Sequence, residues 1–311
     1  MSVGCINCGT PARSLGPLPD SNLFAGRALP DTLPGGELYR CPQCRLGFRH
    51  PRLPKARLDA LYAAGSEASW TWEASDRTDW MLAAQTLRDL LPGPARVLDI
   101  GCFDGTFLAS LGPDVEKCGI EIMPSAAQSA RTKGIRVVAA DFAGLAPAPA
   151  AYDAITAFDV IEHVEDPLAF LSLLASALRP GGVIVISTGN LDAWSWALMR
   201  SSYWYCAIPE HISFLSESWF RHATKTLGLT LERVVRYPHE KAPLRRRMFE
   251  TAANFTYLMA PSAIAALRRR GVGNISRDLA PELNGDYPPG WLTARDHLIV
   301  TIAARPPSSP A

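Results

Sequence analysis

One short segment, residues 96–108, constrains the fold of this chain more than any other. It reads Arg-Val-Leu-Asp-Ile-Gly-Cys-Phe-Asp-Gly-Thr-Phe-Leu. The apolar residues at its start are typical of a buried parallel strand. Gly101 and Gly105 allow the backbone after this strand to turn tightly and to approach a ligand closely. The segment therefore predicts a strand, a glycine turn and a helix start in direct succession, which is where doubly wound α/β sheets bind nucleotide-like cofactors.

A second apolar run, residues 118–120, ends in Glu121, 20 residues beyond Gly101. At this distance the second strand of a doubly wound sheet presents an acid to ribose hydroxyls. Glu121 and the adjacent Ile122 are therefore candidates for binding the nucleoside part of a cofactor. A nicotinamide dinucleotide is one alternative, but its site favours Gly-x-Gly-x-x-Gly, and this turn lacks the third glycine. A strand, turn and helix without a ligand is the other alternative.

Asp99, Gly101 and Gly105 resemble the first motif of class I S-adenosylmethionine-dependent methyltransferases, which usually reads Asp-x-Gly-x-Gly-x-Gly. The cofactor of that family carries no phosphate. Phe103 stands where the family commonly has its middle glycine. The resemblance implies S-adenosylmethionine as the cofactor, with Asp99, Gly101, Cys102 and Gly105 in its site.

The segments that follow resemble the same family in the same order. Asp141 and Phe142 follow an apolar run and resemble the acid and apolar pair that brackets the adenine ring. Residues 152–164 resemble the fourth strand and its turn, with Phe158 as a further candidate for cofactor contact. Residues 296–303 look like the last strand. The resemblance implies an α/β fold with a Rossmann-like seven-stranded methyltransferase sheet.

Four of the seven cysteines form two Cys-x-x-Cys pairs, Cys5 with Cys8 and Cys41 with Cys44. Two such pairs supply four thiolates to a tetrahedral zinc ion. A zinc site with four thiolates has no open position, so we expect it to stabilise a small ribbon fold. Disulfide bonds are the alternative, but nothing in the sequence indicates an oxidising compartment. Residues 16–36, between the pairs, are rich in proline and glycine and predict a loop.

Residues 38–62 resemble the ribbon that precedes a subset of bacterial methyltransferases, including sugar C-methyltransferases of deoxysugar pathways. Some ribosomal RNA methyltransferases also carry a cysteine-rich zinc module, so RNA methylation guided by the ribbon remains an alternative. The predicted organisation is a zinc-ribbon module (1–55), a helical linker or cap (56–92), a methyltransferase core (93–240 and 290–306) and a basic helical insertion (241–289).

Methyl transfer from sulfur is an in-line displacement, so the enzyme must align its acceptor and remove a proton when the acceptor is a hydroxyl. One candidate segment holds Asp159, Glu162 and His163. It resembles the acid-x-x-Glu-His segment of ubiquinone-pathway O-methyltransferases, where it can hold a divalent metal. A hydrogen-bonded loop without a metal is the alternative that we favour for this segment.

The second candidate segment begins at Glu210 and resembles the Glu-His-x-Ser-aromatic segment of the sugar C-methyltransferases. That resemblance implies a base at His211, and we expect the rate to rise with pH near ~6.5 if the imidazole is unperturbed. A histidine that only anchors its loop is the alternative. With His163, these two residues are the catalytic candidates. Five aromatic residues precede them and predict an aromatic-lined acceptor pocket: Trp194, Trp196, Tyr203, Trp204 and Tyr205.

Residues 241–270 contain seven Lys or Arg and one Glu, a net charge of 7 − 1 = +6, around an apolar stretch. Such an insertion can cap the active site, contact an anionic acceptor such as a nucleotide- or lipid-linked sugar, or lie on a membrane surface. A solvated helical hairpin is the alternative.

The chain as a whole has a net charge of +1, which gives no general attraction to nucleic acid. Its N-terminus lacks the basic start and apolar stretch of a signal peptide, so we expect a cytoplasmic protein. The combined prediction is a methyltransferase that acts on a small molecule or saccharide of secondary or envelope metabolism, by O- or C-methylation. A non-catalytic cofactor-binding scaffold is a further alternative.

Overall fold

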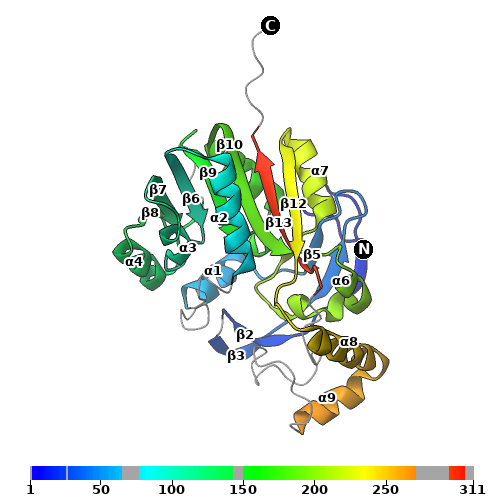
Figure 1. The fold of residues 1–311 in the computed structure, drawn as a ribbon. Coiled ribbons are helices and arrows are strands. Elements are labelled where there is room, and N and C mark those ends of the chain that lie inside the picture. The colour runs from blue at the N-terminus through cyan, green and yellow to red at the C-terminus, as the bar shows by residue number, and fades with distance from the viewer. Residues whose placement is uncertain (1, 26, 65–76, 143–149, 271–293, 305–311) are drawn as a thin grey trace.

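The computed structural model describes residues 2–25, 27–64, 77–142, 150–270 and 294–304. A seven-stranded sheet forms the centre of the molecule (Figure 1). Its strands are β6 (Ala95–Ile100), β7 (Val115–Ile120), β8 (Arg136–Ala139), β9 (Tyr152–Phe158), β10 (Leu178–Gly189), β12 (Thr230–Tyr237) and β13 (His297–Ala303). Their order across the sheet is β12-β13-β10-β9-β6-β7-β8.

The direction of these strands sets where a ligand can bind. β6 to β10 run parallel, whereas β13 runs antiparallel to both β10 and β12. The chain continues from β6 outward to β7 on one side, and it returns to β9 on the other side. Ligands of such sheets bind outside the carboxyl ends of the strands at this switch point. The seven-stranded sheet predicted from the sequence is confirmed.

Apolar residues on both faces of the central strands explain why the sheet is buried between helices. In β6, Val97 belongs to one hydrophobic cluster, and Leu98 and Ile100 belong to another. Neighbouring side chains of a strand point to opposite faces, so a continuous apolar run fills two cores. The covering helices are α2 (Thr78–Leu90), α3 (Thr106–Ala109), α4 (Pro124–Thr132), α5 (Pro167–Ala177) and α7 (Glu217–Leu227).

The N-terminal cysteine module is joined to the core around the seven-stranded sheet through a shared sheet and a shared hydrophobic cluster. Its strands pair with a short core strand in the order β1-β4-β5-β11. Cys5, Cys41 and Cys44 lie in the same hydrophobic cluster as Leu98 and Ile100 of the central sheet. The strands are β1 (Arg13–Pro17), β4 (Glu37–Arg40), β5 (Gly47–His50) and β11 (Ser213–Phe214).

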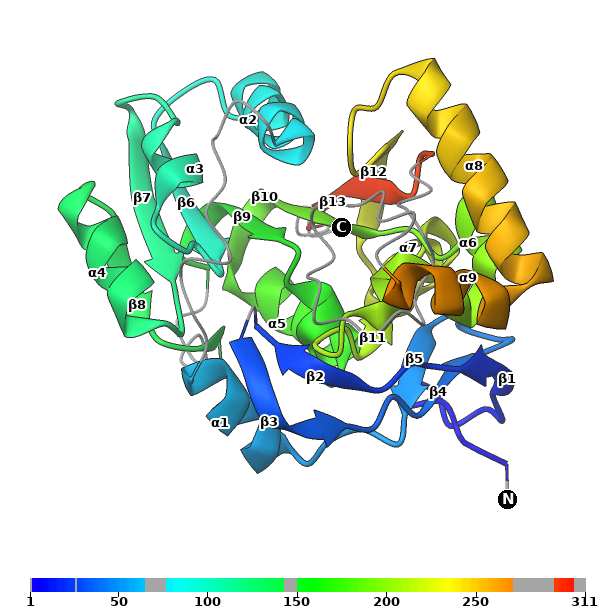
Figure 2. The ribbon, with the colours of Figure 1, turned by 90° about the horizontal axis from the view of Figure 1, so that it is seen from below.

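The loop predicted for residues 16–36 is wrong, because strands β2 (Ser21–Phe24) and β3 (Arg27–Leu33) form an antiparallel hairpin there. Phe24 and Leu33 are buried against α1 (Lys55–Ala63) and Ile212. This packing stabilises strands despite the high proline and glycine content of the segment. A two-stranded hairpin also tolerates proline on its open edges. The hairpin and α1 lie at the carboxyl edge of the parallel strands (Figures 1 and 2).

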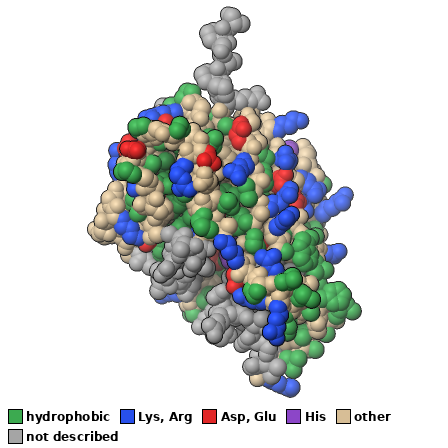
Figure 3. Space-filling model, viewed as in Figure 1, with side chains coloured by type: hydrophobic (Ala, Val, Ile, Leu, Met, Phe, Trp, Pro, Cys, Tyr) green, Lys and Arg blue, Asp and Glu red, His purple; other side chains and the backbone are tan. Residues whose placement is uncertain are grey.

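The insertion between β12 and β13 contains two helices, α8 (Leu244–Met259) and α9 (Pro261–Arg269). Hydrophobic and basic side chains gather on the surface over them (Figure 3). Part of the predicted insertion, residues 271–289, lies outside the described residues. Among the described residues, no helix combines the length and apolarity needed to cross a bilayer. The described residues also include three 3₁₀ turns and one further helix: η3 (Ile161–His163), α6 (Trp194–Met199), η4 (Arg200–Ser202) and η5 (Trp204–Ala207).

Candidate active site

The glycine turn after β6 has the backbone geometry that its sequence predicts. Gly101 and Gly105 have φ values of 69° and 77°, a region that favours glycine. The amide of Gly101 donates to the carbonyl of Ile120 at 2.9 Å, so the turn is fastened to the end of β7. A Cβ added to Gly101 would lie 2.9 Å from Cγ2 of Val160. Phe103, in place of the family's middle glycine, adopts a φ of 47°. The turn therefore packs tightly beside the chain that leaves β9.

Glu121 holds the glycine turn in place through both carboxylate oxygens. Oε2 accepts the amide of Phe103 at 2.9 Å, and Oε1 accepts the amide of Met123 at 2.8 Å. Beneath the turn, the Asp99 carboxyl is buried and lies 2.6 Å from Oγ1 of Thr156. Burial raises the pKa of Asp99 to about 8. Glu121 thus links the turn after β6 to the chain that leaves β7.

The remaining cofactor candidates lie around this turn. Ile122 exposes an apolar side chain next to Glu121, and Asp141 is exposed beyond β8. Phe142 packs against Phe170, with ring centroids 5.1 Å apart. The other candidates, Cys102 and Phe158, are buried and partly buried, and Phe158 packs on Phe107. For all these residues, contact with the cofactor stays a prediction.

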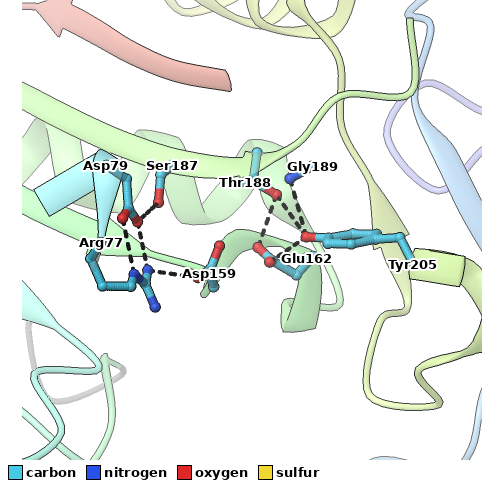
Figure 4. A network of polar contacts seen from close by, with 8 residues as sticks. All are labelled: Arg77, Asp79, Asp159, Glu162, Ser187, Thr188, Gly189 and Tyr205. Carbon is cyan, nitrogen blue, oxygen red and sulfur yellow. Dashed lines mark hydrogen bonds and ion pairs between the residues drawn. The ribbon is translucent and has the colours of Figure 1, made fainter. Parts of the chain in front are cut away.

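A row of polar side chains crosses the carboxyl ends of β9 and β10 (Figure 4). Its first part centres on Arg77, at the start of α2. The Arg77 guanidinium pairs with Asp79 at 2.5 Å and with Asp159 at 2.7 Å. Asp79 also accepts the hydroxyl of Ser187 at 2.8 Å. No sequence pattern marks Arg77, because a single arginine before a helix is common on protein surfaces.

The second part of the row centres on Glu162, which is fully buried. Tyr205 donates its hydroxyl to Oε1 of Glu162 at 2.5 Å, and Thr188 donates to Oε2 at 2.9 Å. Burial raises the pKa of Glu162 to about 7. The ionised and neutral forms of this carboxyl are therefore both populated near neutral pH.

The two histidines predicted from separate segments meet in the structure. The rings of His163 and His211 lie 5.0 Å apart between centroids. Nδ1 of His163 lies 3.0 Å from the hydroxyl of Tyr62. Nδ1 of His211 lies 2.9 Å from the carbonyl of Tyr205. A carbonyl only accepts, so Nδ1 of His211 carries the proton and Nε2 keeps a lone pair.

Burial keeps both imidazoles neutral. It lowers the pKa of His163 to about 4 and the pKa of His211 well below its ordinary value. Neutral imidazoles can act as bases or as metal ligands. Ligand atoms of Glu162, His163 and His211 lie within 4.8 Å of one another. The third member of this cluster is His211, whereas Asp159, the residue predicted from the sequence, pairs with Arg77.

Glu210 faces the hairpin that covers the histidines. Its Oε1 accepts the backbone amide of Ala25, between β2 and β3. Its Oε2 is buried without a hydrogen-bond partner among the described residues. Burial raises the pKa of Glu210 to about 7. The backbone carbonyl of Glu210 lies 3.1 Å from Nδ1 of His163, which joins both predicted catalytic segments.

The predicted aromatic-lined pocket is wrong for four of its five residues. Trp196, Tyr203, Trp204 and Tyr205 are at most 3% exposed and pack into one hydrophobic cluster. Helix α6 carries Trp196, and the turns η4 and η5 carry or flank the other three residues, so that all four rings fill the core. Only Trp194 is exposed, and it lines a separate surface groove of about 370 Å³ with Asp192, Arg221, Arg236 and other residues. Tyr205 still contributes to the site, through its hydroxyl on Glu162 and through its carbonyl and ring beside His211.

The four paired cysteines converge as predicted. Their Sγ atoms all lie within 4.8 Å of one another, with Cys5 3.4 Å from Cys44 and Cys8 3.5 Å from Cys41. All four are free thiols. Thiolates bound at about 2.3 Å to one tetrahedral zinc ion lie about 3.8 Å apart. The cluster therefore fits a small zinc ribbon.

Two arginines connect this ribbon to the catalytic candidates. Arg49 of β5 is buried, and its Nε donates to the carbonyl of His211 at 3.2 Å. Its Nη2 donates to the carbonyl of Cys206 at 3.1 Å. Arg52 donates to the carbonyl of Ile212 at 3.0 Å. The loop that carries His211 is thus held from the ribbon side, a function that no motif indicates for either arginine.

The strand order, the glycine turn at the end of β6 and the acid at the end of β7 define a class I S-adenosylmethionine-dependent methyltransferase. The methyltransferase domain family matches residues 74–234, and the chain belongs to this family. The matched region contains Arg77 and the catalytic candidates. It leaves out the cysteine ribbon and α8 with α9.

Among curated proteins, relatives named ubiquinone biosynthesis O-methyltransferase are similar to this chain. One from Xanthomonas campestris is 36% identical over 132 residues, which are 39% of this chain and 52% of the relative. One from Xylella fastidiosa is 34% identical over 179 residues, which are 51% and 69% of the two chains. The chain thus spans about half the length of the first relative. A solved SAM-dependent methyltransferase from Archaeoglobus fulgidus is 19% identical, with 80% and 100% of the chains covered and a TM-score of 0.45.

Proposed function

We propose that this protein transfers a methyl group from S-adenosylmethionine to a hydroxyl oxygen of a small-molecule acceptor. One observation carries the proposal. Two neutral histidines, His211 buried and His163 partly buried, lie together with Glu162 at the carboxyl edge of the sheet. The names of the curated relatives support an oxygen acceptor.

The residues around the turn fit this cofactor. Gly101 and Gly105 adopt positive φ values, which suit a tight turn whose backbone approaches a ligand, and Glu121 suits ribose hydroxyls. Arg77 and Asp159 offer opposite charges to the carboxylate and ammonium of its amino-acid part. When bound, the cofactor supplies an electrophilic methyl group on a sulfonium.

His211 is the proposed base. Its Nδ1–H is held by the carbonyl of Tyr205, so Nε2 is available to accept the acceptor's hydroxyl proton. Protonation would create a buried positive charge, which an ionised Glu162 in the same cluster would stabilise. Tyr205 and Thr188 orient that carboxylate through their hydroxyls.

Enclosure of the site favours a small acceptor over RNA. His211 is 6% exposed and Glu162 is fully buried beneath the hairpin and α1. Phenols and saccharides are both small molecules that present hydroxyls. We propose that the methyl transfer belongs to secondary or envelope metabolism. A cytoplasmic location stays a prediction of the sequence.

The decisive experiment is a labelled-methyl screen with phenols, sugars and RNA, preceded by calorimetric titration with S-adenosylmethionine. We expect label in a small-molecule ether. His211→Ala should lower turnover about 10²–10⁴-fold, the usual contribution of a positioned base, and leave cofactor affinity unchanged. His222→Ala, on the outer helix α7, is the matched control. Label only in RNA or on carbon, or cofactor binding without any transfer, would contradict the proposal.

We also propose one structural zinc ion at Cys5, Cys8, Cys41 and Cys44. The approach of all four Sγ atoms to one centre supports it. Metal analysis of the purified protein should give one zinc per chain. A disulfide between Cys5 and Cys8 in mass spectrometry, with no zinc, would reject the assignment. A catalytic divalent metal at Glu162, His163 and His211 is a weaker candidate, tested by whether turnover survives chelation of Mg²⁺ and Mn²⁺.

A further inference from the structure

Helix α8 carries a stripe of large apolar side chains on its exposed surface. Leu244, Met248, Phe255 and Met259 are 56–74% exposed. Their spacing of 4, 7 and 4 residues places them on one side of the helix. Phe249 is also more than half exposed beside this stripe. Contiguous apolar surface of this kind marks an interaction site.

The opposite side of α8 is firmly docked on the protein, so the apolar stripe is not a consequence of a loose helix. Glu250, Asn254 and Tyr257 are buried. Arg246 pairs with Glu250 at 2.7 Å, and Tyr257 belongs to the hydrophobic cluster that contains Tyr205. The helix thus presents polar residues and one tyrosine inward and apolar residues outward, the reverse of an ordinary surface helix.

The charge around the stripe is basic. Lys241, Arg245 and Arg270 are exposed at its borders. The single acid of residues 241–270 is Glu250, which is buried and paired. In Figure 3, hydrophobic side chains cover the end of the molecule over α8 and α9, with basic side chains among them. Glu240, next to Lys241, is a partly exposed carboxylate, and it pairs with Arg246. Among the described residues of α8 and its borders, the surface is therefore apolar with an excess of basic side chains, which is typical of helices that lie in a membrane interface.

We propose that α8 and α9 attach this protein to the surface of an anionic lipid bilayer. The apolar stripe enters the boundary between headgroups and acyl chains, and the bordering Lys and Arg contact lipid phosphates. A second copy of the chain fits less well, because a symmetric contact would bring like charges together. Nucleic acid would leave the Leu and Met side chains without apolar partners.

Attachment through α8 would also orient the active site. β12 ends at the carboxyl edge of the sheet and leads directly into α8, so the hairpin, α1 and α8 lie at one end of the molecule (Figures 1 and 2). The edge that carries the catalytic candidates would then face the bilayer. The attachment itself does not depend on the proposed methyl transfer.

Vesicle flotation tests the proposal on the full chain. Wild-type protein should float with vesicles of phosphatidylcholine and phosphatidylglycerol and only weakly with phosphatidylcholine alone. Met248→Ser with Phe255→Ser should weaken binding about tenfold for each side chain, since each would bury a large apolar group. Lys241→Gln with Arg245→Gln should weaken it about fivefold per charge and reduce its salt dependence.

Met81→Ser is the matched control, because Met81 is an exposed apolar residue on α2, outside the patch. It should float like the wild type. Circular dichroism and S-adenosylmethionine affinity should be unchanged in every variant, which separates loss of attachment from loss of folding. Absence of wild-type flotation, flotation unaffected by the α8 substitutions, or a dimer that the same substitutions dissociate would overturn the proposal.

Discussion

The cofactor half and the acceptor half of the site are built in different ways. The proposed cofactor half is local: Gly101, Phe103, Glu121 and Met123 lie within 23 residues, and the Glu121 carboxylate accepts the backbone amides of Phe103 and Met123. The acceptor half brings together segments far apart, and Arg49 contacts His211 across 162 residues. Local backbone geometry demands particular residues at fixed spacing, whereas a long-range assembly leaves no such spacing in the sequence.

The two halves also differ in how many of their ionisable groups burial perturbs. In the acceptor half, burial raises the pKa of Glu162 and Glu210 to about 7 and lowers the pKa of His163 to about 4. In the cofactor half, burial raises the pKa of Asp99, whereas Ile122 and Asp141 are exposed. We therefore expect a change in one half to alter either cofactor affinity or turnover, but not both. Changes that affect the cysteine ribbon should show this difference most strongly.

Removal of zinc is expected to have the largest effect. A structural zinc site contributes on the order of 10 kcal/mol to folding of its module, so chelation should release β5 and Arg49 from the His211 loop. Methyl transfer should fall more than about 10³-fold, because both the base and its enclosure are lost. Calorimetry should show S-adenosylmethionine affinity within about threefold of the untreated protein, since the cofactor half is local.

Restoring zinc to the chelated sample is the control, and activity should return. Equal loss of cofactor affinity and turnover would show that the halves are one unit. The experiment can produce this result, because the cysteines share a hydrophobic cluster with the central sheet, and loss of the ribbon could disturb that sheet.

Glu210→Gln should stabilise the protein at high pH. The pKa of Glu210 rises from 4.5 to about 7 in the folded state, so the folded chain binds more protons than the unfolded chain between these values. Stability from this group is present below about pH 4.5 and is lost as pH rises to about 7. In urea unfolding, the free energy of unfolding of Glu210→Gln should exceed that of the wild type by up to about 3 kcal/mol at pH 8, and the two should be equal at pH 4. An advantage independent of pH would contradict the assignment.

Glu121→Ala tests the cofactor half. The variant loses charge-assisted bonds to the amides of Phe103 and Met123 and the proposed bond to ribose. S-adenosylmethionine affinity should fall by roughly 1.5–3 kcal/mol in calorimetry. Glu116→Ala, at the opposite end of β7, is the control and should bind normally. Turnover at saturating cofactor should change little. A loss of turnover with unchanged cofactor affinity would place Glu121 in the acceptor half and contradict the prediction.

The pH dependence of the rate should show the smallest effect. The sequence alone predicts a rise near ~6.5 from His211, but burial lowers that pKa well below its ordinary value. Glu162 and Glu210 both have a pKa of about 7, and Glu162 is the one of the two that lies in the cluster with both histidines. The rate should rise about tenfold from pH 6 to pH 8, and Glu162→Gln should flatten the profile. Glu210→Gln should retain the rise, and a flat profile in that variant would assign the titration to Glu210.

Much of the cofactor half could be predicted from the sequence because its signals are short-range. Each pattern reflects a structural constraint within a few residues. The patterns are a glycine with positive φ, an acid after an apolar run, and two cysteines three residues apart. The same reasoning failed for residues 16–36, where Phe24 and Leu33 gain burial against α1. It also failed for the aromatic run, since residue type does not reveal whether a ring lines a pocket or fills a core.

The sequence by itself determined the class of fold, the turn at Gly101 and the cluster of four cysteines. Only the tertiary structure decided that His163 and His211 meet, that Arg49 holds their loop and that Arg77 pairs with Asp159. The physical reason is that folding brings side chains that are distant in the sequence together at one edge of the sheet. Their protonation then follows from burial, which is a property of the assembled molecule and not of any segment.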